Sequence, residues 1–190
     1  MRHDLRVDLK AGDLVLRTAR MALDEILGWQ GILLRLRRSE LWRFNGEGDG
    51  FRKAVEDEVA RTSVFVNTTK HNAEFSDGEL LGEGEGLDPD EALEPARVEG
   101  DRHWRLRLFV TEEGGDKEAL RRRVDARLAD VKLLGLKGGV LWEITLAAAD
   151  EQMARGALTG LAISRNRERG LLLNPHFQEG LLLSVEEVDK

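Results

Sequence analysis

Apolar residues follow the pattern of β-strands in five stretches of the chain. Residues 104–110, for example, place four apolar side chains on one face, as expected for a strand with one buried side. After residue 75 the first part of the chain shows no comparable strand, unless the Leu80-Leu81 pair supplies one. The predicted strands cover residues 5–9, 32–44, 104–110, 136–146 and 181–186.

Between these strands, apolar residues recur three or four positions apart, as on the buried face of a helix. Asp13 and Asp116 each follow a glycine and are placed as N-caps of two such helices. Two further helices are expected to begin near Gly50 and near Asp150. The positions on the buried face are, for the helix after Asp13, Val15, Ala19, Ala22, Leu23 and Ile26; for the helix after Asp116, Leu120, Val124, Leu128 and Val131; for the helix near Gly50, Phe51, Val55, Val59, Thr62 and Val66; and for the helix near Asp150, Met153, Ala157 and Leu161.

The order β-α-β-α-(β), with the final strand clear only in the second half, therefore occurs twice, with an offset of about 100 residues. We interpret it as two tandem β-α-β-α-β units. Between the two copies, residues 79–101 are rich in glycine and acidic residues, a composition that predicts a solvated linker or long loop. We therefore expect an α+β protein with a first half (residues 1–78), a connecting segment (79–101) and a second half (102–190). Each half is marginal in size, so the two should pack together as a pseudo-dimer of antiparallel sheets covered by helices.

Composition excludes several classes of protein. The 190 residues are 41% hydrophobic and 34% charged, which is typical of a globular domain. The absence of cysteine excludes disulfides, thiolate metal sites and cysteine nucleophiles. The formal charge of -7 argues against nucleic acid as the main partner. No apolar run approaches the roughly 20 residues of a membrane span, and the first residues do not resemble a signal peptide, so we expect a cytoplasmic protein with no membrane partner.

Candidate catalytic chemistry is sparse. The four histidines have neither metal-ligand spacing nor a nearby carboxylate cluster, and a structural or surface role is expected for each. Gly138-Gly139 is interpreted as a turn or bulge between a helix and a strand. No phosphate-binding glycine loop and no nucleophile elbow are present. We therefore predict no catalytic residue, no metal ligand and no cofactor.

Arginine clusters and tryptophans are the remaining candidates for interaction. Arg37 and Arg38 belong to one cluster with Arg35 and Arg43, and two more clusters lie at 121–123 and 165–169. Such clusters could bind phosphate, RNA or an acidic protein, but paired, solvated helix faces are more common. Trp42 and Trp142 occupy equivalent strand positions, where core packing is the expected role and subunit contact the alternative.

The second half resembles PurS, the small subunit of bacterial phosphoribosylformylglycinamidine synthase. The similarity runs from Trp104 to Val188 and includes Lys137-Gly138-Gly139-Val140-Leu141-Trp142-Glu143-Ile144, then Leu172-Leu173-Asn174-Pro175-His176-Phe177-Gln178-Glu179, then Val185-Glu186. The first half matches more loosely: Ser39-Glu40 replaces the glycines, Arg43 the glutamate and Thr68 the proline. The chain is thus similar to a tandem duplication of PurS.

The resemblance implies a non-catalytic assembly subunit that bridges the glutaminase PurQ and the synthetase PurL, with ATP, magnesium and the ribonucleotide bound by the partners. Self-association is also possible for such a subunit. The interface candidates are Trp42, Trp142, Glu143, Asn174, Pro175, Arg37 and Arg38.

Two other hypotheses stay open from the sequence. The first is a tandem regulatory module similar to ACT domains, which would bind a small effector between paired copies. The second is an enzyme in its own right, for which no acid–base constellation is evident.

Overall fold

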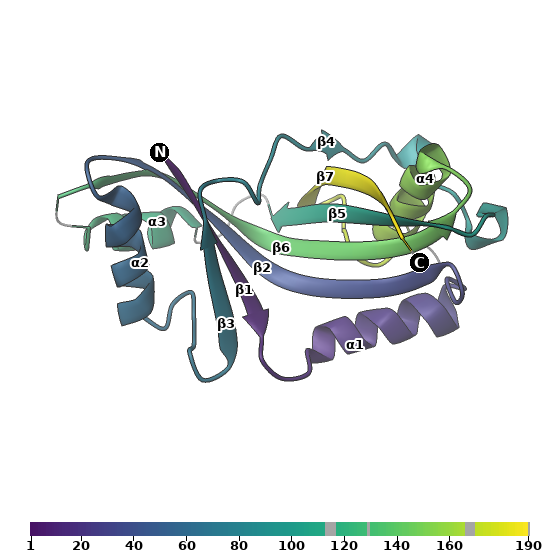
Figure 1. Cartoon of the computed structure of the whole chain (residues 1–190), viewed down its shortest axis with the longest axis horizontal. Helices are drawn as coiled ribbons and strands as arrows, with labels where there is room; N and C mark the ends of the chain where they lie inside the picture. Colours follow the sequence, from purple (N-terminus) through teal and green to yellow (C-terminus); the bar gives the residue numbers. More distant parts are fainter. Residues whose placement is uncertain (113–116, 129, 166–169, 190) are drawn as a thin grey trace. The chain divides into compact units, whose positions relative to one another are not determined.

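The computed structural model of the chain describes residues 1–112, 117–128, 130–165 and 170–189 (Figure 1). Within these residues, α-helices and antiparallel strands confirm the predicted α+β class. The strands form a seven-stranded sheet in the order β3-β1-β2-β6-β5-β7-β4. They are β1 (Arg2–Leu9), β2 (Leu33–Glu47), β3 (His71–Ser76), β4 (Glu85–Gly86), β5 (Arg102–Glu112), β6 (Lys132–Ala148) and β7 (Gln178–Val188). The helices are α1 (Leu14–Met21), α2 (Phe51–Arg61), α3 (Lys117–Asp125) and α4 (Glu151–Ala162).

The third strand of the first half is present, in contrast to the expectation from sequence. β3 pairs antiparallel with β1, with Leu5 opposite Phe75 and Asp4 opposite Ser76. None of its residues is fully buried, and its central residues are exposed, so it lacks the apolar alternation by which strands are recognised. The order β-α-β-α-β is therefore complete in both halves.

The order of strands in the sheet repeats the same plan in the two halves. The first half supplies β3-β1-β2 and the second half supplies β6-β5-β7, the same three strands in reversed order. β1 pairs antiparallel with β2, and β5 pairs antiparallel with β7.

Two of the helix starts are capped as predicted. The Asp13 carboxylate accepts the backbone N–H of Leu16 at 3.0 Å, and Asp150 accepts that of Met153 at 2.8 Å. Asp116 lies outside the described residues. The helix after Asp13 is shorter than its apolar spacing suggests, because α1 ends at Met21 and a π-helical turn, Ala22–Ile26, follows.

The two helices that follow the first strand of each half have different surfaces. In and after α1, the apolar side chains of Leu14, Val15 and Ile26 are exposed, although the spacing had placed Val15 and Ile26 on the buried face. Ile26 lies in the π-helical turn, whose wider spacing changes which positions face the core, whereas Ala19 and Leu23 of the predicted face are buried. Val15 lies in the first turn of α1, before the π-helical turn. On α3 the exposed positions include the charged residues Glu118, Arg122 and Arg123.

The chain divides into two compact units, and each unit contains residues from both halves. Unit 1 consists of Met1–Gly12, Ser39–Gly82 and Gly114–Val140. It therefore contains α2 from the first half and α3 from the second half. Unit 2 consists of Asp13–Arg38, Glu83–Glu113 and Leu141–Lys190, and contains α1 and α4. Compact units and sequence halves do not coincide.

The core of unit 1 requires apolar side chains from both halves. The first half supplies most of them, from β1, β2, α2 and the loop after α2. The second half supplies Val124, Leu128 and Leu133, which are at most 6% exposed. The first-half members are Leu5, Val7, Phe44, Phe51, Val55, Val59, Phe65 and Val66.

Unit 2 has its own buried side chains, again from both halves. Leu23 and Trp29 come from the first half and are at most 2% exposed. From the second half, α4 contacts β5 and β7 and buries Leu158 and Leu161 completely. The alanines on the same helix, Ala154, Ala157 and Ala162, are also fully buried, which indicates close packing of α4.

The connecting segment, residues 79–101, is not a solvated linker along its whole length. In unit 1, Leu81 is only 4% exposed. In unit 2, β4 pairs with β7, and the backbone N–H of Leu93 donates to the carbonyl of Gly156 in α4 at 3.0 Å. A Cβ on Gly156 would lie 2.8 Å from Leu93, so the glycine is needed for this close approach. The acidic side chains stay at the surface while the leucines between them pack.

We expect neither fragment of a split chain to fold alone. A chain of residues 1–82 lacks Val124, Leu128 and Leu133, and each buried side chain of this size stabilises the fold by about 1.5–3 kcal/mol. Urea titrations of residues 1–82 and of 83–190 should show no cooperative transition, and an equimolar mixture should regain one. A cooperative transition in either fragment by itself would contradict the shared core.

Candidate functional site

The segment that carries the predicted Asn174 and Pro175 forms a fixed turn before β7. The carbonyl oxygen of Asn174 accepts the backbone N–H of Phe177 at 3.1 Å and that of Gln178 at 2.9 Å. Its side-chain oxygen accepts the N–H of His176 at 3.1 Å. Gln178 completes the turn, because its side-chain oxygen accepts the N–H of Asn174 at 2.8 Å. The asparagine therefore has a structural role at the turn, as this residue type often does.

The same turn holds an apolar side chain in the solvent. Phe177 is 70% exposed, and the neighbouring His176 contacts its ring edge-on, with 6.4 Å between the ring centroids. Pro175 is exposed as well. An exposed aromatic residue on a hydrogen-bonded turn loses little conformational freedom on binding, which is the property of an interface hot spot. Phe177 was part of the quoted motif but not one of the predicted interface residues.

The two predicted tryptophans differ in burial. Trp142 in β6 is 5% exposed and packs inside unit 2, beside a half-buried Glu143. Trp42 in β2 is half-buried in unit 1, where its ring meets that of Phe65 edge-on at 5.1 Å between centroids. Both positions favour the core-packing role, and contact with a partner stays a prediction.

Gly138 lies inside β6, not in a turn between a helix and a strand as the sequence analysis expected for Gly138-Gly139. The Trp42 ring covers its backbone, and a Cβ at this position would lie 2.4 Å from two ring atoms. A glycine within a strand is typical of such a close approach. Gly138 thus has a packing function in unit 1.

The predicted cluster of Arg35, Arg37, Arg38 and Arg43 does not form a single basic patch. Arg37 is exposed, whereas Arg38 forms an ion pair with Asp13, the N-cap of α1, at 3.2 Å. Arg43 is buried and binds Asp4. Of the four residues, Arg35 and Arg37 are left as exposed interaction candidates.

Glu118 neutralises part of the second arginine cluster. Its carboxylate accepts from Arg121 at 2.9 Å and from Arg122 at 3.0 Å. These hydrogen bonds lower the pKa of Glu118 to about 2. The sequence analysis expected arginine clusters to be solvated helix faces paired with glutamate, and Arg121 and Arg122 on α3 confirm this. In the third cluster, Arg167 and Arg169 lie outside the described residues.

A buried ion pair in unit 1 was not found from the sequence. Asp4 is completely buried and accepts two hydrogen bonds from Arg43, each 2.7 Å long. It also accepts the backbone N–H groups of Leu80 at 3.0 Å and Leu81 at 3.1 Å, and Arg43 donates to the carbonyl of Gly78 at 2.8 Å. Buried charges are stable only when paired and hydrogen-bonded, and here Asp4 accepts four hydrogen bonds while Arg43 donates three. The pair attaches the start of the connecting segment to β1.

His3, adjacent to this pair, is also buried, with the structural role expected for it. Its Nε2 atom lies 2.9 Å from the carboxylate of Glu56, and its ring stacks on Phe75 with 4.9 Å between centroids. The partners lie 53 and 72 residues away in sequence, so no local pattern indicates them.

Glu58 on α2 connects residues of the two halves within unit 1. It accepts from Arg61, one turn further along α2, and from Arg127 of the second half at 3.0 Å. Burial of Glu58 raises its pKa, but the hydrogen bonds and charges of Arg61 and Arg127 outweigh burial, and the pKa lies below its ordinary value.

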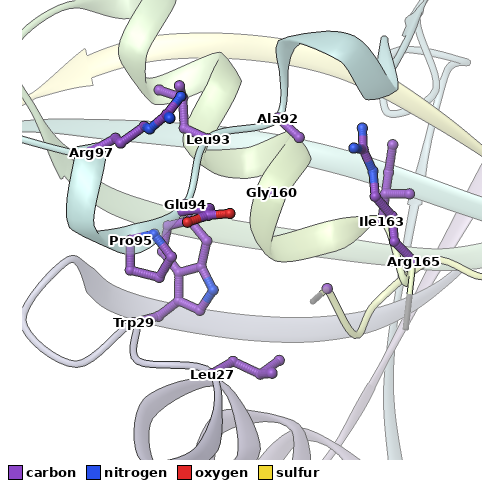
Figure 2. Close-up of a pocket in the computed structure, with 11 residues that line it drawn as sticks. Leu27, Trp29, Ala92, Leu93, Glu94, Pro95, Arg97, Gly160, Ile163 and Arg165 are labelled. Atoms are coloured by element: carbon purple, nitrogen blue, oxygen red, sulfur yellow. The ribbon is translucent and has the colours of Figure 1, made fainter. Parts of the chain in front are cut away.

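A cavity of about 500 Å³ lies in unit 2 (Figure 2). Three parts of the chain line it: the turn after α1, the connecting segment and the end of α4 with the residues that follow. No motif in the sequence indicates it, because the three parts are far apart along the chain. The lining residues are Leu27, Trp29, Ala92, Leu93, Glu94, Pro95, Arg97, Gly160, Ile163, Arg165 and Gly170.

Within the described part of the chain, no three histidine or acidic residues are grouped as metal ligands. None of the described helices combines the length and the apolar character needed to cross a membrane. The chain was compared with models of protein families, with curated proteins and with solved structures, and nothing matches it.

Replacing Gly138 with alanine should destabilise the protein by about 1–3 kcal/mol, because the added methyl group overpacks the Trp42 ring. Chemical denaturation monitored by circular dichroism measures this difference. Gly86→Ala is the matched control, since Gly86 is also a strand residue but a Cβ there meets nothing within 4 Å. Equal stability of the two variants would contradict the packing role of Gly138.

Replacing Glu58 with glutamine should lower the free energy of unfolding at pH 7 by about 1–2 kcal/mol. Because the folded-state pKa is lowered, the carboxylate stabilises the fold above the unfolded value of 4.5 and ceases to do so as pH falls through the folded-state pKa. The difference from the unmodified chain should therefore shrink in urea titrations repeated at pH 3.

Asp57→Asn is the control for this measurement. It removes an exposed ion pair with Lys53 on the same helix, and exposed pairs contribute little. A loss as small as that of Asp57→Asn would show that Glu58 does not hold the two halves together.

Proposed function

We propose that this chain is a non-catalytic assembly subunit of a phosphoribosylformylglycinamidine synthase complex, which bridges the glutaminase PurQ and the synthetase PurL. The observation that carries the proposal is the repeated order β-α-β-α-β with mirrored strand order, β3-β1-β2 and β6-β5-β7. It supports a tandem duplication of one small unit, and the motifs of the second half resemble PurS.

The shared cores support the same proposal. Unit 1 contains α2 and α3, and unit 2 contains α1 and α4, so each unit contains one helix from each half. The core of unit 1 combines apolar side chains from both halves. Two separate subunits would make such contacts across a self-complementary interface. In this chain they are made within one polypeptide, as expected for a fused form of a dimeric subunit.

The 174–178 turn is the proposed contact with a partner subunit. It presents Phe177 to solvent together with Pro175 and His176, in a backbone fixed by Asn174 and Gln178. Burial of a phenylalanine on binding contributes about 1.5–3 kcal/mol. On this proposal, PurQ and PurL supply the catalytic residues and bind ATP, magnesium and the ribonucleotide.

The proposal predicts co-purification of the chain with PurL and PurQ in a pull-down with added glutamine and ADP. Replacing Phe177 with serine should weaken binding about tenfold or more, because a central apolar contact is lost, while the fold is retained. Ile26→Ser is the control. Ile26 is an apolar residue of similar exposure, but it lies in the π-helical turn after α1 and not in the 174–178 turn.

Three outcomes distinguish the parts of this proposal. Recovery of neither partner, with or without glutamine and ADP, contradicts the assembly role. Recovery of both partners with equal loss for the two variants keeps the assembly role but excludes the 174–178 turn as the contact. Weaker binding of the partners by Phe177→Ser, but not by Ile26→Ser, supports both the assembly role and the 174–178 turn as the contact.

A further inference from the structure

Apolar side chains form part of the wall of the cavity in unit 2. Trp29 is 2% exposed overall, so its indole is held in place by the core of the unit. Leu27, Leu93, Pro95 and Ile163 add apolar surface to the lining. A volume of about 500 Å³ is in the range of sites that bind small molecules, and such sites combine apolar walls with a few polar groups.

Three charged residues, Glu94, Arg97 and Arg165, line the cavity. Figure 2 shows Arg97 and Arg165 on opposite sides of the cavity, with Glu94 between them, next to Trp29 and Pro95. Among the described residues, neither Arg97 nor Arg165 has a side-chain hydrogen bond or an ion pair. Both guanidinium groups are therefore available to an incoming anion.

We propose that this cavity binds an elongated small molecule that has an anionic group at each end and an apolar body between them. The two ends would be bound by Arg97 and Arg165, and the body would lie along Trp29, Leu27 and Ile163. Guanidinium groups recognise carboxylate and phosphate oxygens through charge-assisted hydrogen bonds, so either kind of end group fits.

A ligand at this site would connect three parts of the chain. Leu27 and Trp29 belong to the first half, Arg97 to the connecting segment, and Ile163 and Arg165 to the second half. Binding to the folded state alone raises its stability, so the ligand should also raise the melting temperature. This inference does not depend on the assembly role and would hold if PurL and PurQ were not partners.

The test uses three eight-carbon probes on the full chain: suberate with two carboxylates, octanoate with one, and 1,8-octanediol with none. Isothermal titration calorimetry and the thermal shift measure their binding. Each lost charge-assisted contact should weaken binding about tenfold, so the expected order of affinity is suberate, octanoate, octanediol. Octyl phosphate in place of octanoate distinguishes a preference for phosphate from one for carboxylate.

Variants connect the affinity to the cavity. Arg97→Gln and Arg165→Gln should each reduce the affinity for suberate to about that of octanoate. Arg35→Gln removes an exposed arginine outside the lining and should leave the affinity unchanged. All three positions are exposed, so folding is retained, which the unliganded melting curve verifies.

Several results would overturn the proposal. Equal binding of the diol and suberate would show that the arginines take no part. Equal binding of octanoate and suberate would exclude recognition of both ends. Unchanged suberate affinity in Arg97→Gln and Arg165→Gln would place the binding elsewhere, and no heat and no thermal shift at millimolar suberate would exclude the site.

Discussion

The packing of helices from one half with strands from the other is the constraint on which the rest of the structure depends. In unit 1, Val124, Leu128 and Leu133 complete a core built around Phe44, Phe51 and other first-half residues. The Glu58–Arg127 ion pair joins the same two parts at the edge of that core. Since burial of apolar area is the main stabilising term in folding, neither half has a complete core by itself.

Buried charges then determine where the chain leaves unit 1. Asp4 has no exposed surface and accepts four hydrogen bonds, two of them from the backbone of Leu80 and Leu81. A buried carboxylate without these partners would be strongly unfavourable, so the charge helps to specify the position of the segment, together with the burial of Leu81. This explains how a segment rich in glycine and acidic residues is nevertheless ordered against β1.

Much of the fold could be predicted from periodicity, and the exceptions have physical causes. The caps at Asp13 and Asp150 and most strands follow from local patterns, because local patterns determine those elements. β3 was missed because it is mostly exposed, and Ile26 was misplaced because a π-helical turn changes the helical register. Val15 precedes that turn, and nothing in the structure explains its exposure. Gly138-Gly139 was interpreted as a turn or bulge; Gly138 lies within β6 and not in a turn, and its contact with the Trp42 ring, which is distant in sequence, left no local pattern.

The candidate sites were less predictable than the fold. Arg37 and Arg38 are neighbours in sequence but alternate in direction along a strand, so one is exposed and the other binds Asp13. The cavity depends on three separated parts of the chain, and its arginines are not near one another in sequence. Residues that meet only through tertiary structure leave no spacing by which a sequence pattern could identify them.

The contrasting surfaces of α1 and α3 have a consequence for how such a chain could evolve. A dimer of identical subunits must present the same residues twice, so any substitution changes both faces together. Once the two copies are joined in one gene, that obligation ends. The apolar exposure of Leu14, Val15 and Ile26 and the charged exposure of Glu118, Arg122 and Arg123 show two helices with the same place in the repeat and dissimilar chemistry. On the proposed duplication, a fused chain could discriminate between two unlike neighbours, which a symmetric pair cannot do.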